Sequence, residues 1–347
     1  MADTGTSKGE ERQIGVIGLG RWGPHYVRVF SQLVGSTVSI ACDRNPDKAL
    51  DIKNLFPHVE VTSDPAAVLS SEAVDAVVIA TPASTHFEIA LACLKAKKDV
   101  LVEKPLALTV DDCQVLTDAA DRTGLILMVG HTFIYNAGVR KMRELVEKGE
   151  LGNVYYLLFN RTHLGPIRDD VSALWDLAPH DISIASFVLG SLPIGVSAVA
   201  KAFLRNDRAD VAFVTLYFPG GVIANLHVSW IDSNKERRVV VVGSEKRVVF
   251  DDLNNLEQIR IFEKGASTEK LVTDFGEFKL LLRDGDIISP RIDVSEPLRN
   301  MCTHFIDCIN TREKPLTDGK AGADVVRVME AIEESLDRKG GYVDIEW

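Results

Sequence analysis

The sequence has few cysteines and no pattern of residues that usually binds a metal. Its cysteines are widely spaced, form no C-x-x-C pair and are odd in number, and no H-E-x-x-H motif occurs. Isolated cysteines of this kind are typical of reduced, structural thiols in a reducing compartment. His163, His180 and Asp181 lie near one another in the chain, but not at the spacing of a zinc site. We expect no metal cofactor. The cysteines are Cys42, Cys93, Cys113, Cys302 and Cys308.

An excess of positive charge is also missing. The chain has 39 Lys and Arg residues against 50 Asp and Glu residues, for a formal net charge of −11. Such a protein is a poor candidate for binding the phosphate backbone of nucleic acids. Residues 1–12 are small, polar and charged, and they lack the apolar core of a secretory signal. We therefore expect a flexible tail over residues 1–12 and a cytoplasmic protein.

An uncharged stretch, from Ile182 to Ala200, approaches the length of a membrane span. Gly190, Pro193 and Gly195 interrupt it. A helix that ends at Gly190 and is followed by a buried strand explains this pattern better than a span. We expect no contact with a membrane.

The first part of the chain alternates between short apolar runs and longer segments with helical periodicity. This alternation predicts an α/β fold: a doubly wound parallel sheet, covered on both faces, over residues 13–131. The apolar runs are Ile14–Ile17, Val38–Ala41, Ala76–Ala80, Val100–Val102 and Ile126–Val129. The helical segments are Trp22–Val34, Pro46–Phe56, His86–Lys97 and Val110–Thr123.

The alternation of apolar runs and helical segments ends after His131, and residues 132–347 are predicted to form a second, α+β domain. A helix over Ala137–Lys148 precedes several alternating segments with a tight turn at Pro219–Gly221. This order predicts a large open sheet that is mostly antiparallel. Two helices end the chain, over Pro297–Asn310 and Ala321–Arg338, and the second is expected to pack back on the first domain. The predicted strands are Val154–Thr162, Val196–Leu204, Val211–Phe218, Val222–Trp230 and Val239–Val242.

A G-x-G-x-x-G motif, with Gly18, Gly20 and Gly23, follows the first predicted strand and opens the first predicted helix. In this context Gly18 permits a tight turn, Gly20 lets the backbone approach a pyrophosphate, and Gly23 allows close packing of helix and strand. The helix N-terminus supplies N–H groups to the phosphates. We expect a dinucleotide here, with Arg21 and Trp22 of the same turn also in contact with it.

Asp43 ends the second predicted strand, about twenty residues after the motif, where an acidic residue usually binds the adenosine ribose. Its charge would repel a 2′-phosphate, which favours NAD over NADP. Arg44 leaves NADP open, because it could either stack on adenine or pair with that phosphate.

Two further patterns point to a chemical site. Glu103-Lys104-Pro105 follows the strand Val100–Val102, and ligands bind outside the carboxyl ends of such strands. Asp176 and His180 are four residues apart and would share one face of a helix or helical turn. Taken alone, each pattern also has an ordinary structural explanation. Lys104 could be a solvated surface lysine, and His180 could be a histidine with a role in packing.

Through these motifs the chain resembles, over nearly its whole length, the glucose–fructose oxidoreductase, inositol dehydrogenase and rhizopine-catabolism family (Gfo/Idh/MocA). The resemblance implies a Rossmann domain joined to an open, mostly antiparallel sheet. It also implies that Lys104 and His180 are catalytic, that Asp176 assists, and that the nicotinamide cofactor is bound by further residues. Those residues are Thr81, Pro82, His86, Glu103, Lys104 and Trp175.

The residue types suit the oxidation of a secondary alcohol, which sends a hydride to nicotinamide and a proton to a base. A histidine with the ordinary pKa of about 6.5 can take that proton near neutral pH. We expect His180 to be this base, Asp176 to orient it, and Lys104 to stabilise the developing alkoxide. Lys104 and His180 could exchange these roles.

Polar side chains interleaved with aromatics after His131 suit a sugar substrate. The expected substrate residues are Lys104, Tyr135, Asn160, Arg161, His163, Arg168, Asp176 and His180. Arg161, Arg168 or Arg237 could bind a diphosphate or carboxylate.

The stretch from Trp175 to Asp181 looks like the family members that oxidise the 3-hydroxyl of a UDP-linked N-acetylhexosamine. Rival readings are an inositol or free-aldose dehydrogenase, a keto-sugar reductase, a redox-neutral glycoside-cleaving enzyme and an NAD-sensing regulator. Strands with apolar residues on both faces favour a homodimer or homotetramer formed through the second sheet.

Overall fold

The computed structural model describes residues 11–165, 167, 171–204, 208–269, 279–293 and 295–347. By its internal contacts the chain divides into two units. The first comprises Met1–Thr132 and Glu296–Val326, and the second comprises Phe133–Ser295 and Arg327–Trp347. This division differs from the expected one, because the segment Glu296–Val326 groups with the first unit. The first strand already begins at Arg12, within the expected tail; residues 1–10 of that tail lie outside the described residues.

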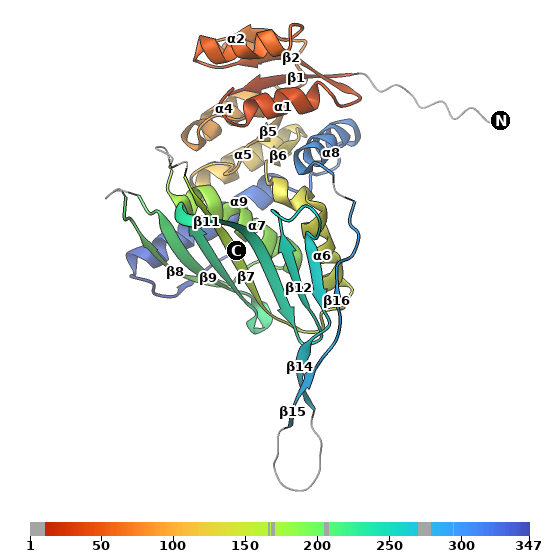
Figure 1. Ribbon diagram of the computed structural model, residues 1–347. Coiled ribbons are helices and arrows are strands. Elements are labelled where there is room, and N and C mark those ends of the chain that lie inside the picture. The colour runs from red at the N-terminus through yellow and green to blue at the C-terminus, as the bar shows by residue number, and fades with distance from the viewer. Residues whose placement is uncertain (1–10, 166, 168–170, 205–207, 270–278, 294) are drawn as a thin grey trace, which may run out of the picture. The chain divides into compact units, whose positions relative to one another are not determined.

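Within the described residues, the first unit contains a six-stranded parallel sheet in the order β3-β2-β1-β4-β5-β6 (Figure 1). This order is that of a Rossmann sheet, so the predicted fold of this half is confirmed. The strands are β1 (Arg12–Ile17), β2 (Ser36–Cys42), β3 (Glu60–Thr62), β4 (Ala76–Ile79), β5 (Asp99–Val102) and β6 (Leu127–Val129). The helices are α1 (Gly23–Phe30), α2 (Pro46–Leu55), α3 (Pro65–Ser70), η1 (Ala83–Thr85), α4 (His86–Lys95), α5 (Val110–Thr123) and α8 (Pro297–Thr311).

Two local features of this unit differ from the prediction. Helix α1 ends at Phe30 rather than Val34, because the chain turns there toward β2 through Gly35 at φ +85°. Val34 lies in that turn and is fully exposed. Strand β3 and helix α3 were not predicted, since the three residues of β3 are exposed or half-buried and form no apolar run.

The second unit contains a sheet whose described strands run in the order β16-β13-β12-β11-β7-β10-β9-β8-β17. Only β7 and β10 pair in parallel among these strands, so the predicted mostly antiparallel sheet is confirmed. The strands are β7 (Val154–Leu164), β8 (Gly195–Lys201), β9 (Val211–Tyr217), β10 (Ile223–Ser229), β11 (Ile231–Gly243), β12 (Arg247–Asp251), β13 (Ile259–Phe262), β16 (Ile287–Ile288) and β17 (Val343–Asp344). A separate hairpin pairs β14 (Gly265–Glu269) with β15 (Lys279–Arg283).

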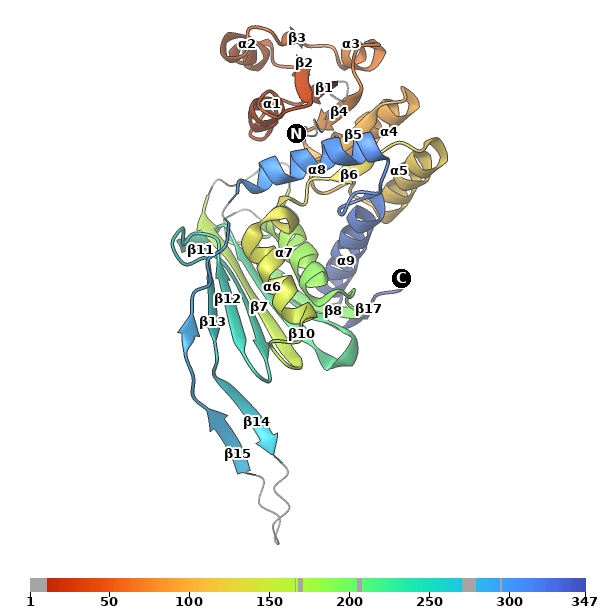
Figure 2. The same cartoon turned by 90° about the vertical axis from the view of Figure 1, so that its right-hand side faces the viewer.

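Helices α6 (Ala137–Glu147) and α7 (Ala173–Leu189) lie on one face of the sheet of the second unit (Figure 2). Helix α9 (Gly319–Asp337) begins in the first unit and ends in the second, and the short helices η2 (Thr132–Tyr135) and η3 (Pro219–Gly221) complete the described helices. Helix α7 ends where predicted, with Gly190 at φ +64° as its C-cap. Strand β7 continues to Leu164, two residues beyond the predicted strand, and α7 starts at Ala173.

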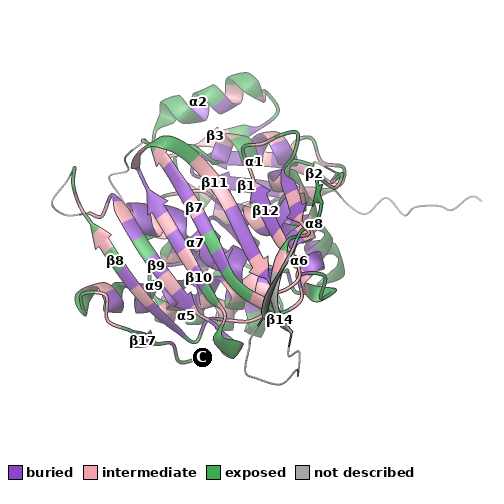
Figure 3. Ribbon diagram, turned by 60° about the horizontal axis from the view of Figure 1, so that its bottom comes forward, coloured by how far each residue is buried: buried purple, intermediate pink, exposed green. Residues whose placement is uncertain are grey.

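The two faces of the sheet of the second unit differ in burial, as the alternating colours along its strands in Figure 3 indicate. In β7, Leu157 and Phe159 are at most 1% exposed, whereas Tyr156 and Leu158 are 37% and 41% exposed. Successive residues of a strand point to opposite faces, so one face packs against α6 and α7 and the other is open. We call these the helix face and the open face. No helix among the described residues is long and apolar enough to cross a membrane.

Candidate active site

The turn between β1 and α1 presses its backbone against the end of β4. Gly18 has φ +95°, and a Cβ on it would come within 2.6 Å of the carbonyl carbon of Ala80. A Cβ on Gly23 would come within 2.0 Å of the carbonyl oxygen of Gly18. These two glycines are therefore required by the fold itself. Gly20 is different, because a Cβ there would meet no protein atom within 4 Å. The space at Gly20 is open, as the predicted approach to a pyrophosphate requires.

Asp43 has a structural role at the same turn. Its Oδ2 accepts a hydrogen bond of 2.7 Å from the Leu19 N–H, and its Oδ1 accepts one of 2.8 Å from the Asn45 N–H. The carboxylate thus ties the end of β2 to the glycine turn. The other residues predicted for the cofactor in this region, Arg21, Trp22 and Arg44, are exposed beside it.

His86 does not lie at the surface with them. It is 1% exposed at the start of α4, with Nδ1 2.7 Å from the Pro105 carbonyl oxygen and Nε2 2.9 Å from the Thr81 carbonyl oxygen. Carbonyls only accept hydrogen bonds, so both bonds form together when the ring is doubly protonated. His86 therefore connects the segment after β4, with the half-buried Thr81 and the exposed Pro82, to the segment that carries Lys104. Its predicted contact with the cofactor is replaced by this buried link.

Glu103 is also part of the scaffold. It is buried, its Oε1 accepts a 2.6 Å hydrogen bond from the Tyr26 hydroxyl, and its Oε2 accepts one of 3.2 Å from the Lys104 N–H. Burial, and then the neighbouring Glu103 charge, raise the pKa of Tyr26 well above its ordinary value, so the phenol stays protonated. Tyr26 and Glu103 hold the backbone at Lys104, whose half-buried side chain stands at the carboxyl end of β5.

His131 follows β6 near Lys104. It is 2% exposed, and neither ring nitrogen has a hydrogen-bond partner among the described residues. Burial, and to a smaller degree the Lys104 charge, lower the pKa of His131 to about 4. His131 is therefore neutral near pH 7 and cannot cause a titration of activity in that range.

In the second unit, helix α7 places Asp176 and His180 on adjacent turns. The side chain of Ser172 caps the helix by accepting a hydrogen bond of 3.4 Å from the Trp175 N–H. Leu177, Ala178 and Pro179 are buried, whereas Asp176 and His180 are half-buried. The predicted helical spacing is therefore confirmed, and both side chains belong to the less buried side of the helix.

Strand β7 separates three residues that were predicted to line one pocket. Arg161 and His163 share a face of the strand, whereas Asn160 points to the other. The Asn160 Nδ2 donates a 3.0 Å hydrogen bond to Glu236 Oε2, and the residue faces Arg238 across the sheet. Asn160 thus lies on the open face, so the prediction that it shares a pocket with Arg161 is wrong.

Arg161 is on the helix face, but it is not available to a substrate. It is 5% exposed, and its Nε and Nη2 donate hydrogen bonds of 2.9 and 2.7 Å to Oδ1 of Asp181 in α7. Its guanidinium carbon also lies 4.4 Å from the centre of the Phe133 ring. The predicted substrate role of Arg161 is therefore corrected to a buried ion pair.

Two other predicted residues have different surroundings from those expected. The Trp175 indole N–H donates a 2.7 Å hydrogen bond to Glu333 of α9, which holds the ring toward that helix. Tyr135 is 1% exposed, with the Arg140 guanidinium 5.4 Å from its ring centre, so it offers no free surface to a sugar. Arg168 lies outside the described residues.

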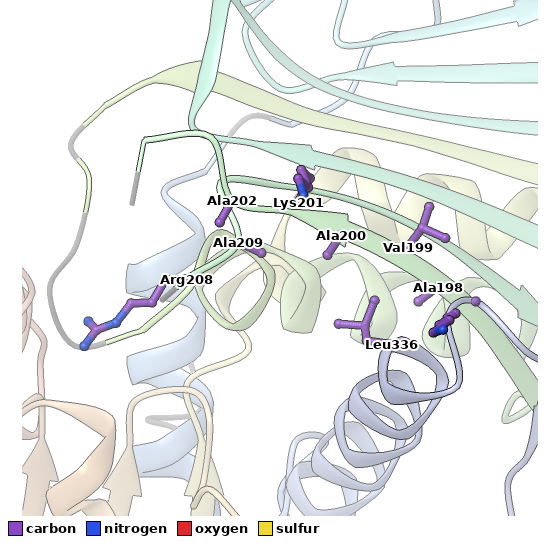
Figure 4. Close-up of a pocket in the computed structure, with 10 residues that line it drawn as sticks. Ala198, Val199, Ala200, Lys201, Ala202, Arg208, Ala209 and Leu336 are labelled. Carbon is purple, nitrogen blue, oxygen red and sulfur yellow. The ribbon is translucent and has the colours of Figure 1, made fainter. Parts of the chain in front are cut away.

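Two grooves in the described part of the second unit are lined by residues other than Asp176 and His180. One, of about 360 Å³, is formed by residues 198–202 of β8 and its end, Arg208, Ala209 and the end of α9; Figure 4 shows Arg208 extending away from Ala198 and Leu336. Another, of about 520 Å³, is formed by residues 234–238 of β11 and 251–256 around the end of β12. The described residues contain no group of three His, Cys, Asp or Glu side chains arranged for a metal ion.

Sequence patterns alone could not identify several residues that support the site. Phe133 contacts His180 with a ring-centre distance of 5.1 Å, yet it lies in a segment that was read only as a connection between the domains. Asp181 and Tyr26 likewise acquire their roles from partners that are distant in the chain, Arg161 and Glu103. Only knowledge of strand register and helix packing could have identified them.

The open space at Gly20 yields a test of the cofactor turn. We expect Gly20→Ala to leave the thermal stability of the protein unchanged, and to weaken NADH binding on the order of tenfold, about 1.4 kcal/mol, because the methyl group would occupy the approach of the pyrophosphate. Thermal unfolding and titration of NADH fluorescence measure the two effects. Gly23→Ala is the contrasting variant and should destabilise the fold. Unchanged NADH affinity in folded Gly20→Ala would argue against this turn as the cofactor site.

Comparison with known proteins identifies the family of both domains. Residues 12–131 match the Gfo/Idh/MocA oxidoreductase family with an NAD-binding Rossmann fold, and residues 139–249 match the Gfo/Idh/MocA C-terminal domain. The chain is 27% identical over 336 residues to the UDP-N-acetylglucosamine 3-dehydrogenase of Acidithiobacillus ferrooxidans, which covers 93% of this chain and 98% of the relative. It is 25% identical over 343 residues to the myo-inositol 2-dehydrogenase of Thermotoga maritima, which covers 94% and 97%.

A solved structure gives the same result for the fold. The WlbA dehydrogenase of Bordetella pertussis, in complex with NADH and UDP-GlcNAcA, superposes with a TM-score of 0.79 at 19% identity and covers 97% of this chain and 100% of that one. At this identity the likeness shows the fold alone. The two family matches together span most of the sequence and both units, and the chain therefore belongs to the Gfo/Idh/MocA family of NAD-binding oxidoreductases.

Proposed function

We propose that the protein is an NAD-dependent dehydrogenase that oxidises the 3-hydroxyl of a nucleotide-linked N-acetylhexosamine. Dehydrogenase activity is supported by the half-buried side chains of Asp176 and His180, which lie on adjacent turns of α7. The chain also has Lys104 after the end of β5. The observation that favours this substrate is the similarity, over nearly the whole length of both chains, to a UDP-N-acetylglucosamine 3-dehydrogenase.

In this proposal each residue has one chemical task. His180 accepts the proton of the substrate hydroxyl, and Asp176, four residues earlier on α7, stabilises the resulting imidazolium. Lys104 stabilises the negative charge that develops on the oxygen. A bound nicotinamide would supply the acceptor for the hydride of the carbon that bears this hydroxyl, so that the alcohol loses two electrons and becomes a ketone.

Asp43 supports NAD as the cofactor. Its carboxylate is fixed by the N–H groups of Leu19 and Asn45 and cannot easily turn away from a ligand at the end of β2. A 2′-phosphate on the adenosine ribose would meet this fixed negative charge, whereas ribose hydroxyls can donate hydrogen bonds to it.

The reaction is tested by absorbance at 340 nm, with NAD and NADP offered separately against UDP-N-acetylhexosamines, inositols and simple aldoses. We expect NADH to form with UDP-N-acetylglucosamine or its uronic acid. His180→Gln should lower kcat/KM by about 10²–10⁴-fold, because the base for proton transfer is lost. In the unmodified enzyme, activity should fall as the pH falls through the pKa of the base, because a protonated imidazole cannot accept a proton.

Other outcomes of this assay separate the rival functions. Reduction of NAD by inositols or aldoses alone would replace the proposed substrate, and the similarity to a myo-inositol 2-dehydrogenase makes inositol the first of these. Full activity of His180→Gln would move the role of base to another residue. No reduction with any substrate, in a protein that still binds NAD, would favour a redox-neutral enzyme or a regulator.

A nucleotide-linked substrate also needs a cation for its diphosphate, and the structure narrows the choice among the candidate arginines. Arg161 is committed to Asp181. Arg237 lies opposite Arg161 across the strand pair β11–β7 and therefore shares the helix face with it. The Arg237 side chain is 33% exposed, with its Nη1 3.4 Å from Asp252 Oδ2. We infer that Arg237 is a better candidate than Arg161 for binding the diphosphate.

The neighbouring arginine provides a matched control. We expect Arg237→Gln to raise KM for a UDP-sugar about tenfold without changing kcat, because a charge-assisted contact to the non-reacting part of the substrate is lost. Arg238→Gln, one residue further on the open face and beside Glu236, should leave both constants unchanged. Steady-state kinetics give both values. Equal effects of the two substitutions would contradict a diphosphate contact on the helix face.

The open face supports a homo-oligomer. Exposed apolar side chains lie next to one another on it, because Ile223 pairs with Tyr156 across one strand pair and Val199 pairs with Phe213 across another. Their exposed fractions are between 37% and 53%. Exposed apolar pairs of this kind are costly in water, and we propose that a second copy of the chain covers them.

Sedimentation tests this proposal. We expect the protein to sediment above its monomer mass of 38.1 kDa, and Leu158→Glu, in the middle of the open face, to shift it to the monomer by placing a charge in the interface. Val34→Glu, at a fully exposed site of the first unit, is the control and should change nothing. A monomer at micromolar concentration before any substitution would rule the proposal out.

A further inference from the structure

The ion pair between Arg161 and Asp181 is built in an unusual way. Both donors of Arg161, Nε and Nη2, converge on Oδ1 of Asp181. The other carboxylate oxygen, Oδ2, is buried and has no hydrogen-bond partner among the described residues. Burial raises the pKa of Asp181 although Arg161 lowers it. A buried pair with an unsatisfied oxygen is a poor source of stability, so its presence calls for another explanation.

The guanidinium of Arg161 has a second contact that the ion pair holds in place. Its Cζ lies 4.4 Å from the centre of the Phe133 ring, the distance of a cation–π interaction. The ion pair leaves Arg161 almost no freedom to move, since the side chains of Arg161 and Asp181 are 6% and 2% exposed. Phe133 is therefore held against a fixed group.

Phe133 in turn contacts the proposed base. Its ring centre lies 5.1 Å from that of the His180 imidazole, with an angle of 67° between the ring planes. This edge-to-face geometry is directional, because an aromatic ring has a negative face and a positive edge. The contact thus restrains the tilt of the imidazole as well as its position.

We propose that Phe133, Arg161 and Asp181 form a support that orients His180 for proton transfer. Asp181 fixes Arg161, Arg161 fixes Phe133, and Phe133 fixes the ring of His180. None of the three touches the substrate, so they are positioning residues. The support spans α7, β7 and the chain just after β6, and it therefore couples the orientation of His180 to the packing of α7 on the helix face. This inference rests on the proposed role of His180 as the base.

The second unit contains a matched pair for the test. Phe187, also in α7, has the Arg143 guanidinium 4.5 Å from its ring centre, and Arg143 Nη1 donates a 2.9 Å hydrogen bond to the Phe187 carbonyl oxygen. Phe187→Leu and Phe133→Leu therefore remove the same kind of interaction and keep an apolar side chain of similar size. Of these two phenylalanines, Phe133 is the one that contacts His180.

We expect Phe133→Leu to lower kcat about ten- to a hundredfold while KM and the affinity for NADH stay unchanged, because a misplaced base slows proton transfer without altering binding. Phe187→Leu should leave kcat unchanged. The second readout is the ¹⁵N signal of the His180 ring in the protein without substrate, identified by its absence from His180→Gln. Phe133→Leu should change its tautomer balance or titration, and Phe187→Leu should not.

Arg161→Lys extends the test, since it keeps the charge but loses the planar fork that binds Oδ1 and stacks on Phe133. We expect the same loss of kcat as in Phe133→Leu. If this variant does not fold, Phe133→Leu still decides the question. Wild-type kcat and an unchanged His180 signal in Phe133→Leu would overturn the support. Full activity in His180→Gln would instead overturn the proposed base, and the ¹⁵N signal would still report whether Phe133 orients the ring.

Discussion

The pleat of strand β7 decides on which face of the second-unit sheet each candidate residue of the strand lies. Side chains alternate between the two faces, so Arg161 and His163 point toward the helices while Asn160 points away from them. The pairings with β10 and β11 extend this rule to neighbouring strands and assign Arg237 to the helix face and Arg238 to the open face. A shift of one residue in this register would exchange the two sets. The proposed chemistry and the proposed oligomer surface thus depend on the same alternation.

Polar residues that look like ligand-binding groups in the sequence often turn out to hold the backbone in place. Asp43 accepts two backbone N–H groups at the glycine turn, and His86 binds two carbonyl oxygens. Glu103 accepts the hydroxyl of Tyr26 and the N–H of Lys104. These bonds fix loops at the carboxyl ends of the strands, where a loop without such bonds would not keep a catalytic side chain in a defined position. A scaffold role and a ligand role need not conflict in Asp43, but burial excludes the second role for His86.

The difference between what the sequence predicted and what it missed has a physical cause. Strands β1, β4 and β5 were predicted because a parallel strand buried on both faces is a continuous apolar run, and α7 placed Asp176 and His180 as predicted because helical spacing is local. Strand β3 has no buried residue, so nothing in its composition marks it. Arg161 was assigned to the substrate because its partner Asp181 is brought to it only when α7 packs on β7. The grouping of Glu296–Val326 with the first unit is likewise a result of packing, such as the edge-to-face contact of Phe305 with Phe30 at 6.3 Å.

The surroundings of four described histidines explain why His180 is the one proposed as the base. Near Lys104, His131 is neutral because burial lowers its pKa to about 4, and His86 has both nitrogens bound to carbonyls. Neither can take a proton from a substrate near neutral pH. In the second unit, His227 stacks on Phe213 on the open face, at a ring-centre distance of 4.6 Å. His180 differs from these three, since it is half-buried, follows Asp176 by one helical turn and is held by Phe133. In the proposal, Lys104 supplies a positive charge and His180 supplies a base, and these two functions have opposite requirements. A charge that stabilises an alkoxide would suppress the protonation of a histidine placed permanently beside it, as Lys104 does for His131.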